Sequence, residues 1–571
     1  MSVHLLALLC AVGAVVATVA SGTATGRLSR RPRGSPVQGP GTRAAVARGT
    51  SQRGVPGFHP SPPRGGRGGW TRPPGVGSEP TRGARWAQRR DLSALVVRRA
   101  PGTGRLVLGE MPSLWRTCHV VAERSQSVAV VGPTQSGKTT ALAVPALLGW
   151  DGPVLAASVK TDLVRDTLEW RRRCGDVWCF DPARTTGLPP SSWSPVAAAR
   201  SWPGARRVAA DLTQVTKAEG TTADGEFWYA TAAKLLAPLL FAAAVSGGTV
   251  RDVARWLDEQ DTEEVTDILH GAGVPEALQA ARATWLRDDR QRSAIYTTAE
   301  TVLAPFAEAE AAGDGVPSTN IAEVGCRPDD TPPYGVPVLA KTAAASGHID
   351  PSALLTGRHT LYLCAPAHDQ RRFRALFVAL VDQVLHAAFA RASQRGAPLD
   401  PPLLVLLDEA ANIAPLRDLD AIAATGAGHG IQLLTVWQDL AQVRARYGER
   451  AATVVNNHRA KLFLPGIADP ATLDFASQLA GDQELDAPSV SIGARGERTV
   501  TTSPTVRRLL PTDALRRQPP GSAVLLYGSL PPAKVRLRPW FQDSVLAGRV
   551  PRTSGVIAQG MARRMPLQSR R

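Results

Sequence analysis

Cysteine is scarce in this 571-residue chain, which has six, and no two of them form a Cys-x-x-Cys pair. A disulfide framework or a structural zinc site would require paired or clustered cysteines. The sequence therefore argues against both, and we expect reduced, partly buried thiols in a cytosolic domain. The hydrophobic fraction of 43% and the aromatic fraction of 5% suit a globular α/β protein, and the length predicts two or three folded units.

The middle of the chain lacks the positive charge that the total of +17 suggests. Residues 1–100 contain 16 arginines and two acidic residues, and residues 544–571 contain six arginines and no acidic residue. Residues 101–543 therefore carry a net charge of −3. The high charge alone would suggest a nucleic-acid-binding fold. Here it indicates only that the two tails favour anionic surfaces, either lipid or nucleic acid.

Positive charge is also absent before the first apolar segment, residues 3–22, which is long enough to span a bilayer. Four arginines follow this segment between residues 27 and 33, and the positive-inside rule keeps such a flank in the cytoplasm. We predict a transmembrane anchor at 1–22, with the N-terminus outside and the bulk of the chain cytoplasmic. The protein would then be a single-pass protein of the plasma membrane. A cleaved secretory signal with its site near Thr18-Val19-Ala20 is the alternative.

Two segments have the composition of unfolded chain. Residues 23–95 are rich in glycine, proline, arginine and serine, and cannot bury enough apolar surface to offset their ordering entropy. We predict a disordered basic tether there and a basic C-terminal tail at 546–571.

The most specific motif is Gly-Pro-Thr-Gln-Ser-Gly-Lys-Thr at residues 132–139, a phosphate-binding loop. An expected strand at 127–131 precedes it and an expected helix follows it, which is the context this loop requires. Its backbone N–H groups and the helix N-terminus favour phosphate. Lys138 is expected to reach the β- and γ-phosphates, and the Thr139 hydroxyl to bind Mg²⁺. The predicted nucleotide contacts are Gly132, Pro133, Thr134, Gln135, Ser136, Gly137, Lys138, Thr139 and Thr140.

A second apolar segment, residues 403–407, ends in two acidic residues. Asp408 is predicted to hold Mg²⁺ together with Thr139, and Glu409 to act as the general base for the attacking water. Gln438 follows the next expected strand, which we place beside the Asp-Glu strand, and we predict that it senses the γ-phosphate. An ordinary glutamine at a helix start is the alternative reading. Paired with the phosphate-binding loop, the two acids predict an ATPase with ATP and Mg²⁺ as its ligands.

The order of the expected elements predicts an α/β fold: a RecA-like P-loop NTPase sheet that is interrupted by an all-α insertion domain. Apolar strands alternate with helices on both sides of a long Ala/Leu-rich helical stretch that has no clear strand. We predict a first RecA-like part at 96–202, the insertion at 203–330 and a second RecA-like part at 331–545.

Several motifs in order resemble the TraG/TraD-like coupling proteins of type IV secretion and conjugation, over residues 105–545. The segments that carry the resemblance are 132–139, 159–163, 180–182, 193–195, 226–228, 407–410 and 437–439. The resemblance implies a membrane-anchored homohexameric ATPase at the inner membrane. Its implied partners are DNA or a relaxase–DNA complex and the components of a type IV secretion channel.

One departure from the family concerns the arginine finger. Members often carry a basic residue in the loop before the glutamine strand, but residues 425–430 contain no arginine or lysine. Either another arginine takes this role, with Arg417 and Arg459 as the candidates, or hydrolysis is only weakly stimulated. His429 is expected to be a plain loop residue. The alternatives to a DNA-coupling ATPase are a protein-effector export ATPase, an FtsK-like pump for double-stranded DNA and a non-catalytic tethered adaptor.

Overall fold

The computed structural model describes residues 83–98, 104–111, 118–216, 223–313, 347–366, 368–492 and 498–551. The predicted anchor at 1–22, most of the tether and most of the C-terminal tail lie outside these residues. All described residues belong to one compact unit, Gly77–Arg571.

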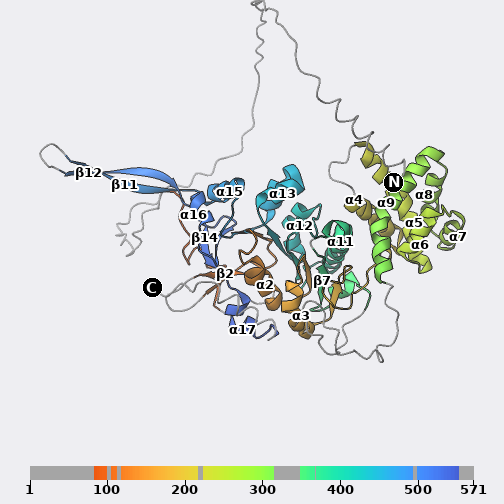
Figure 1. Cartoon of the computed structure of the whole chain (residues 1–571), viewed down its shortest axis with the longest axis horizontal. Helices are drawn as coiled ribbons and strands as arrows, with labels where there is room; N and C mark the ends of the chain where they lie inside the picture. The colour runs from red at the N-terminus through yellow and green to blue at the C-terminus, as the bar shows by residue number, and fades with distance from the viewer. Residues whose placement is uncertain are drawn as a thin grey trace, which may run out of the picture. The chain divides into compact units, whose positions relative to one another are not determined.

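A mixed sheet forms the core of this unit (Figure 1). It has twelve strands in the order β1-β3-β2-β14-β13-β10-β4-β9-β8-β5-β7-β6. Its strands are β1 (Val96–Val97), β2 (Val107–Met111), β3 (Cys118–Val121), β4 (Val128–Val131), β5 (Val154–Ser158), β6 (Val177–Phe180), β7 (Thr360–Cys364), β8 (Leu403–Leu407), β9 (Ile431–Trp437), β10 (Ala460–Phe463), β13 (Ser522–Tyr527) and β14 (Ala533–Arg536).

The seven strands from β10 to β6 pair in parallel, and the strands on the other side of β10 pair antiparallel. Every residue of β5, β7, β8 and β9 is buried, because helices cover both faces of a parallel sheet. The sheet has an apolar cluster on each face, and successive residues of β8 pack into different clusters. Val405 lies in one cluster and Leu404 in the other. The carboxyl ends of the parallel strands meet at one edge, where open α/β sheets bind their ligands.

Helices and short helical turns connect these strands. They are η1 (Thr139–Ala143), α2 (Val144–Gly149), α3 (Asp162–Cys174), η2 (Pro195–Ala199), α10 (Pro351–Leu354), α11 (Gln370–Arg395), α12 (Leu419–Thr425), η3 (Gly426–His429), α13 (Leu440–Tyr447), η4 (Gly448–Arg450), α14 (Ala451–Asn457), α15 (Pro470–Ala480), α16 (Thr512–Arg516), η5 (Trp540–Gln542) and α17 (Ser544–Ala547).

The described residues between β6 and β7 form no strand. Besides the short elements η2 and α10, six longer helices lie in the described part of this stretch. They are α4 (Trp202–Thr216), α5 (Ala223–Ser246), α6 (Val250–Asp258), α7 (Glu263–Gly271), α8 (Pro275–Trp285) and α9 (Asp289–Gly313). Their apolar residues join the same cluster as one face of the sheet, where the ring of Phe306 lies 6.4 Å from that of Trp193. These helices therefore interrupt the chain between two neighbouring strands in the parallel part of the mixed sheet. The predicted domain boundary at residue 330 lies outside the described residues and stays a prediction.

Among the described residues, two helices, Gly225–Ser246 and Arg372–Arg395, are long and apolar enough to cross a membrane by length and composition. In both, 61% of the apolar window is buried inside the protein, as in the core helix of a folded domain.

The predicted tether extends too far into the folded region. Residues 83–95 are folded, and Leu92 and Leu95 are each 1% exposed. The ring of Trp86 packs against the apolar cluster, with the Lys534 ammonium 4.4 Å from its centroid. The arginine-rich composition of this stretch concealed a few well-spaced apolar side chains. The folded chain begins by residue 83.

A two-stranded antiparallel ribbon was not expected from the sequence. Its strands, β11 (Asp482–Ile492) and β12 (Arg498–Arg508), pair with each other in a sheet of their own. Figure 1 shows them as two long blue strands. At their base, Gly83 forms a bridge with Gln483, so the beginning of the folded chain is tied to this ribbon.

Candidate active site

The loop 132–139 leaves β4 at the carboxyl edge of the sheet and enters η1. Two of its residues have positive φ, Gln135 at 63° and Gly137 at 94°, and glycine adopts such angles without strain. At Gly132 a Cβ atom would lie 2.8 Å from Leu464 Cβ and 2.9 Å from Ser136 Oγ. The loop therefore has no room for a side chain at its first position, and its backbone turns tightly.

Lys138 points its ammonium back into this loop. Its side chain is buried, and Nζ donates to the carbonyl oxygens of Gly132, at 2.5 Å, and Pro133, at 2.6 Å. Burial lowers the pKa of Lys138, whereas Asp408 and Glu409 act to raise it. Because its partners are neutral carbonyls, this buried cation lacks a charged acceptor within the loop. A phosphate group would supply one, so the residues fit the predicted ligand.

Asp408 follows β8 and is 3% exposed. Its Oδ2 accepts hydrogen bonds from two hydroxyl groups, Thr139 Oγ1 at 3.4 Å and Ser158 Oγ at 3.1 Å. Burial raises the pKa of Asp408, and the hydrogen bond from Ser158 opposes this rise. A carboxylate and a threonine hydroxyl within contact distance are oxygen ligands of the kind that Mg²⁺ prefers. The structure thus brings together the two predicted metal ligands.

Glu409 differs from its neighbour in backbone and exposure. Its φ of 62° lies in the left-handed region, which ends the strand and leaves the side chain partly exposed beside the buried Asp408. Asn412 Nδ2 donates to Glu409 Oε2 at 3.3 Å, and the next residue, Ala410, donates its N–H to the Val436 carbonyl of β9. Glu409 is therefore an accessible carboxylate on an anchored turn.

Gln438 follows β9, the strand that lies between β4 and β8. The Gly132 N–H donates to the Trp437 carbonyl at 3.1 Å, so the phosphate-binding loop is bonded directly to the residue before Gln438. The Gln438 N–H donates to Gln442 Oε1, and Asp439 caps α13. The expected adjacency of the glutamine strand and the Asp-Glu strand is present. The sensing role of Gln438 stays a prediction.

The two arginine-finger candidates form contacts outside this cluster. Arg417 is exposed and donates to Gln214 Oε1 of α4. Arg459 precedes β10 at the amino edge of the sheet, and its Nε donates to Glu123 Oε2 at 2.7 Å. His429 lies in the turn η3 and its Nδ1 contacts a backbone carbonyl of the same turn region, as a loop residue would. Within its own chain, neither arginine bonds a residue of the predicted site.

Ser158 is the contact that sequence reasoning missed. It ends β5, directly before the segment 159–163 that contributed to the family resemblance. A single serine at a strand end carries little signal, because strand pairing and not sequence spacing brings it beside Asp408.

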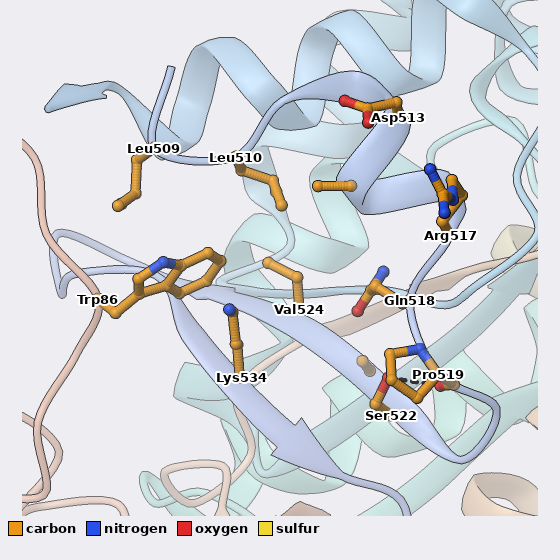
Figure 2. Close-up of a pocket in the computed structure, with 12 residues that line it drawn as sticks. Trp86, Leu509, Leu510, Asp513, Arg517, Gln518, Pro519, Ser522, Val524 and Lys534 are labelled. Carbon is orange, nitrogen blue, oxygen red and sulfur yellow. Dashed lines mark hydrogen bonds between the residues drawn. The ribbon is translucent and has the colours of Figure 1, made fainter. Parts of the chain in front are cut away.

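A separate cavity of about 590 Å³ lies among Trp86, α16, β13 and β14 (Figure 2). The Trp86 ring and the Lys534 ammonium line one side of this cavity. Asp513 of α16 and Arg517, which follows α16, lie on the other side. The residues drawn in Figure 2 include none of the predicted site residues.

The fold and this site define the class of the protein. A phosphate-binding loop follows a central parallel strand, and an aspartate and a glutamate follow a strand two positions away in the sheet. The protein has the fold of the P-loop NTPases, with a RecA-like sheet.

The family follows from comparison with known proteins. The model of the family described as "Type IV secretory system Conjugative DNA transfer" matches residues 85–564. The chain belongs to this family, and the predicted resemblance to conjugative coupling proteins is confirmed.

Two curated relatives are similar to most of this chain. Conjugal transfer protein TraG of Escherichia coli is 23% identical over 529 residues, which cover 82% of this chain and 77% of TraG. Protein VirD4 of Rhizobium rhizogenes is 25% identical over 437 residues, which cover 73% of this chain and 59% of VirD4.

Solved structures share the fold. The bacterial conjugative coupling protein TrwBdeltaN70 matches with a TM-score of 0.57 and 18% identity, over 81% of this chain and 95% of that one. The plasmid coupling protein TrwB in complex with ADP and Mg²⁺ matches with a TM-score of 0.55 and 19% identity, over 81% and 96%. The predicted RecA-like α/β fold is confirmed.

Proposed function

We propose that this protein is a membrane-anchored ATPase that couples ATP hydrolysis to the recruitment and translocation of DNA, as a relaxase–DNA complex, into a type IV secretion channel. The observation that carries the proposal is the meeting of Lys138, Thr139, Asp408 and Glu409 at one edge of the sheet in a member of the conjugative DNA transfer family. The TraG and TrwB names of its relatives support the conjugative role.

Each residue has a distinct task in this proposal. The N–H groups of residues 132–139 and the Lys138 ammonium bind the β- and γ-phosphates of ATP. Thr139 and Asp408 would hold Mg²⁺, which supplies positive charge to the phosphates. Glu409, partly exposed and anchored beside Asp408, accepts the proton of the water that attacks the γ-phosphate. Gln438, bonded through its neighbour to the loop, responds to the γ-phosphate.

The proposal includes a homohexamer at the inner membrane, with a single span at 1–22 and contacts to channel components. Family membership supports the assembly and the partners. The basic tails support contact with anionic lipid or DNA.

A second candidate, export of protein effectors without DNA, is favoured by the net charge of −3 over residues 101–543. A core of this charge gives no general attraction to a polyanion, so DNA contact would require the tails or a locally basic surface.

The two candidates differ in their response to DNA. We expect single- or double-stranded DNA to raise the steady-state rate of ATP hydrolysis by the full-length protein several-fold. The matched control is Lys138→Ala, which should show no hydrolysis with or without DNA. Hydrolysis that neither form of DNA stimulates would favour protein cargo. Hydrolysis that survives Lys138→Ala would contradict the ATPase assignment itself.

The contribution of the tether can be measured in the same system. Its deletion should end at residue 82, because residue 83 already belongs to the folded chain. We expect the deletion of 23–82 to weaken DNA binding and to flatten its dependence on salt, since it removes arginines that contact phosphates. Basal hydrolysis should not change. An unaltered salt dependence would place the DNA contact elsewhere.

A further inference from the structure

The pairing of β5 with β8 brings Ser158 beside Asp408. Ala157 lies opposite Leu407 in this parallel pair, and Ser158 and Asp408 come one position later on each strand. The Asp408 N–H also donates to the Ala157 carbonyl at 2.9 Å, which extends the pairing to the aspartate backbone. Neighbouring residues in such a pair direct their side chains to the same face of the sheet. The fold itself therefore places a hydroxyl next to this carboxylate.

The proton of the Ser158 hydroxyl is directed to Asp408. The Lys160 N–H donates to Ser158 Oγ at 3.2 Å, while Ser158 Oγ lies 3.1 Å from Asp408 Oδ2. A serine hydroxyl has one proton to donate and two lone pairs that accept. Because the Lys160 N–H occupies a lone pair and an ionised carboxylate can only accept, the hydroxyl proton goes to Oδ2. Ser158 is 2% exposed, so water does not compete freely for this bond.

Thr139 and Ser158 contact the same oxygen of Asp408, Oδ2, but have different roles. Thr139 is itself a candidate metal ligand, so its hydroxyl is committed to the metal when one is bound. Lys138 donates to loop carbonyls and not to Asp408. Thr139 and Ser158 donate the side-chain hydrogen bonds to Asp408 found in the described part of the chain, and the bond from Ser158 is the one that metal binding would leave in place.

We propose that Ser158 is a positioning residue that fixes the Asp408 carboxylate for Mg²⁺ binding. This inference rests on the proposed ATPase function and adds a residue to its site. Groups that hydrogen-bond a metal ligand set its orientation, and their loss commonly lowers metal affinity or activity about 10- to 100-fold. Without Ser158, the buried carboxylate would be free to rotate away from Thr139.

A purely structural role for Ser158 makes a different prediction. If the hydroxyl only accepts a backbone N–H in the turn between β5 and α3, its removal would weaken folding. It would then impair nucleotide binding equally with and without metal. A positioning role affects the metal-dependent part alone, since Lys138 and the loop backbone bind phosphate independently of Asp408.

The test uses three variants of the full-length protein. Ser158→Ala removes the hydroxyl, Ser158→Thr retains it, and Ser127→Ala is the matched control. Ser127 is equally buried and donates one hydrogen bond, to the Ala423 carbonyl, but it precedes β4 at the opposite edge of the sheet. For each variant, affinity for a fluorescent ATP analogue is measured in EDTA, and ATP turnover is measured over a range of MgCl₂. Thermal unfolding is recorded alongside.

We expect Ser158→Ala to raise the Mg²⁺ concentration for half-maximal turnover about tenfold, with metal-free affinity for the analogue within about twofold of wild type. Ser158→Thr and Ser127→Ala should keep the wild-type Mg²⁺ dependence. An unchanged Mg²⁺ dependence in Ser158→Ala, beside an active wild type, would overturn the positioning role and leave the ATPase function standing. An equal loss of affinity with and without metal would also overturn it. A wild type that neither binds nor hydrolyses ATP would overturn both proposals.

Discussion

Lys138, which is buried, and Lys461, which is half-buried, lie near neighbouring strands of one sheet but at its opposite edges. Lys138 follows β4 at the carboxyl edge, and Lys461 lies in β10 near the amino edge, where its Nζ donates to the His458 carbonyl at 2.6 Å. Burial lowers the pKa of both lysines. Both donate to backbone carbonyls, so the kind of hydrogen-bond partner alone does not distinguish them.

Their surroundings do distinguish them. Around Lys138, the polar groups come from strands far apart in the sequence, two carboxylates lie close by, and the loop backbone is held in left-handed conformations. Around Lys461, the contacts join adjacent segments, α14 and β10. The comparison teaches that the carboxyl edge is arranged to accept a ligand, whereas the amino edge holds the fold together.

Replacing the two lysines tests this contrast with the largest expected effect. Lys138→Ala should lower ATP turnover by at least about 10²–10³-fold, because it removes the cation that faces the phosphates, with little change in the melting temperature. Lys461→Ala should leave turnover within about twofold. It should lower the free energy of unfolding by about 1–2 kcal/mol, since it leaves a partly buried carbonyl without its donor. Steady-state kinetics and denaturant titration measure both quantities. The reverse pattern would contradict the contrast between the edges.

His458 provides a pH test of the amino edge. It is fully buried, its Nδ1–H donates to the Val454 carbonyl, and its Nε2 accepts from Thr435 Oγ1. Burial lowers its pKa from 6.5 to about 4. Between these values the unfolded chain binds a proton that the folded protein excludes, so stability is intact above pH 6.5 and falls as the pH decreases toward 4. The shift corresponds to about 3 kcal/mol.

The measurement compares unfolding free energies of wild type and His458→Gln at pH 7 and pH 4.5. The wild type should lose more stability than the variant on acidification, and the difference isolates the histidine from other titrating groups. Turnover at pH 7 should keep its Mg²⁺ dependence in the variant. Equal losses in both proteins would contradict the assigned neutral, buried state of His458.

The smallest expected effect concerns Arg459. Its ion pair with Glu123 is exposed, at 48% and 40% of the two side chains, so Arg459→Ala should cost less than about 1 kcal/mol of stability. Because it lies at the amino edge, turnover should remain within about twofold. A fall of tenfold or more, without a change in stability, would show that Arg459 acts on the active site of a neighbouring subunit as an arginine finger.

Much of the site could be read from the sequence because each motif is local. The loop 132–139 and the pair Asp408-Glu409 follow short apolar strands, and the carboxyl ends of parallel strands meet at one edge. The strand that carries Gln438 was expected beside β8 for the same reason.

The other parts of the site and fold could not be predicted, because they depend on contacts between segments far apart in the sequence. Ser158 has no distinguishing neighbours in sequence, and only the β5–β8 register brings it to Asp408. The folding of residues 83–95 was hidden by their arginine-rich composition, since two buried leucines and Trp86 are enough to dock such a segment. The β11–β12 ribbon was missed because its strands form a sheet of their own, and the apolar side chains described on it, Leu485 and Val506, are exposed and give no buried-strand pattern.

The central claim is that the carboxyl edge both binds and hydrolyses ATP, and Glu409→Gln separates these two steps. Glutamine keeps the size of the side chain but cannot accept the proton of the attacking water. The account predicts that the full-length variant binds ATP with Mg²⁺ as tightly as wild type, while its single-turnover conversion of bound ATP to ADP is slower by about 10²–10⁴-fold. Conversion at the wild-type rate would contradict it.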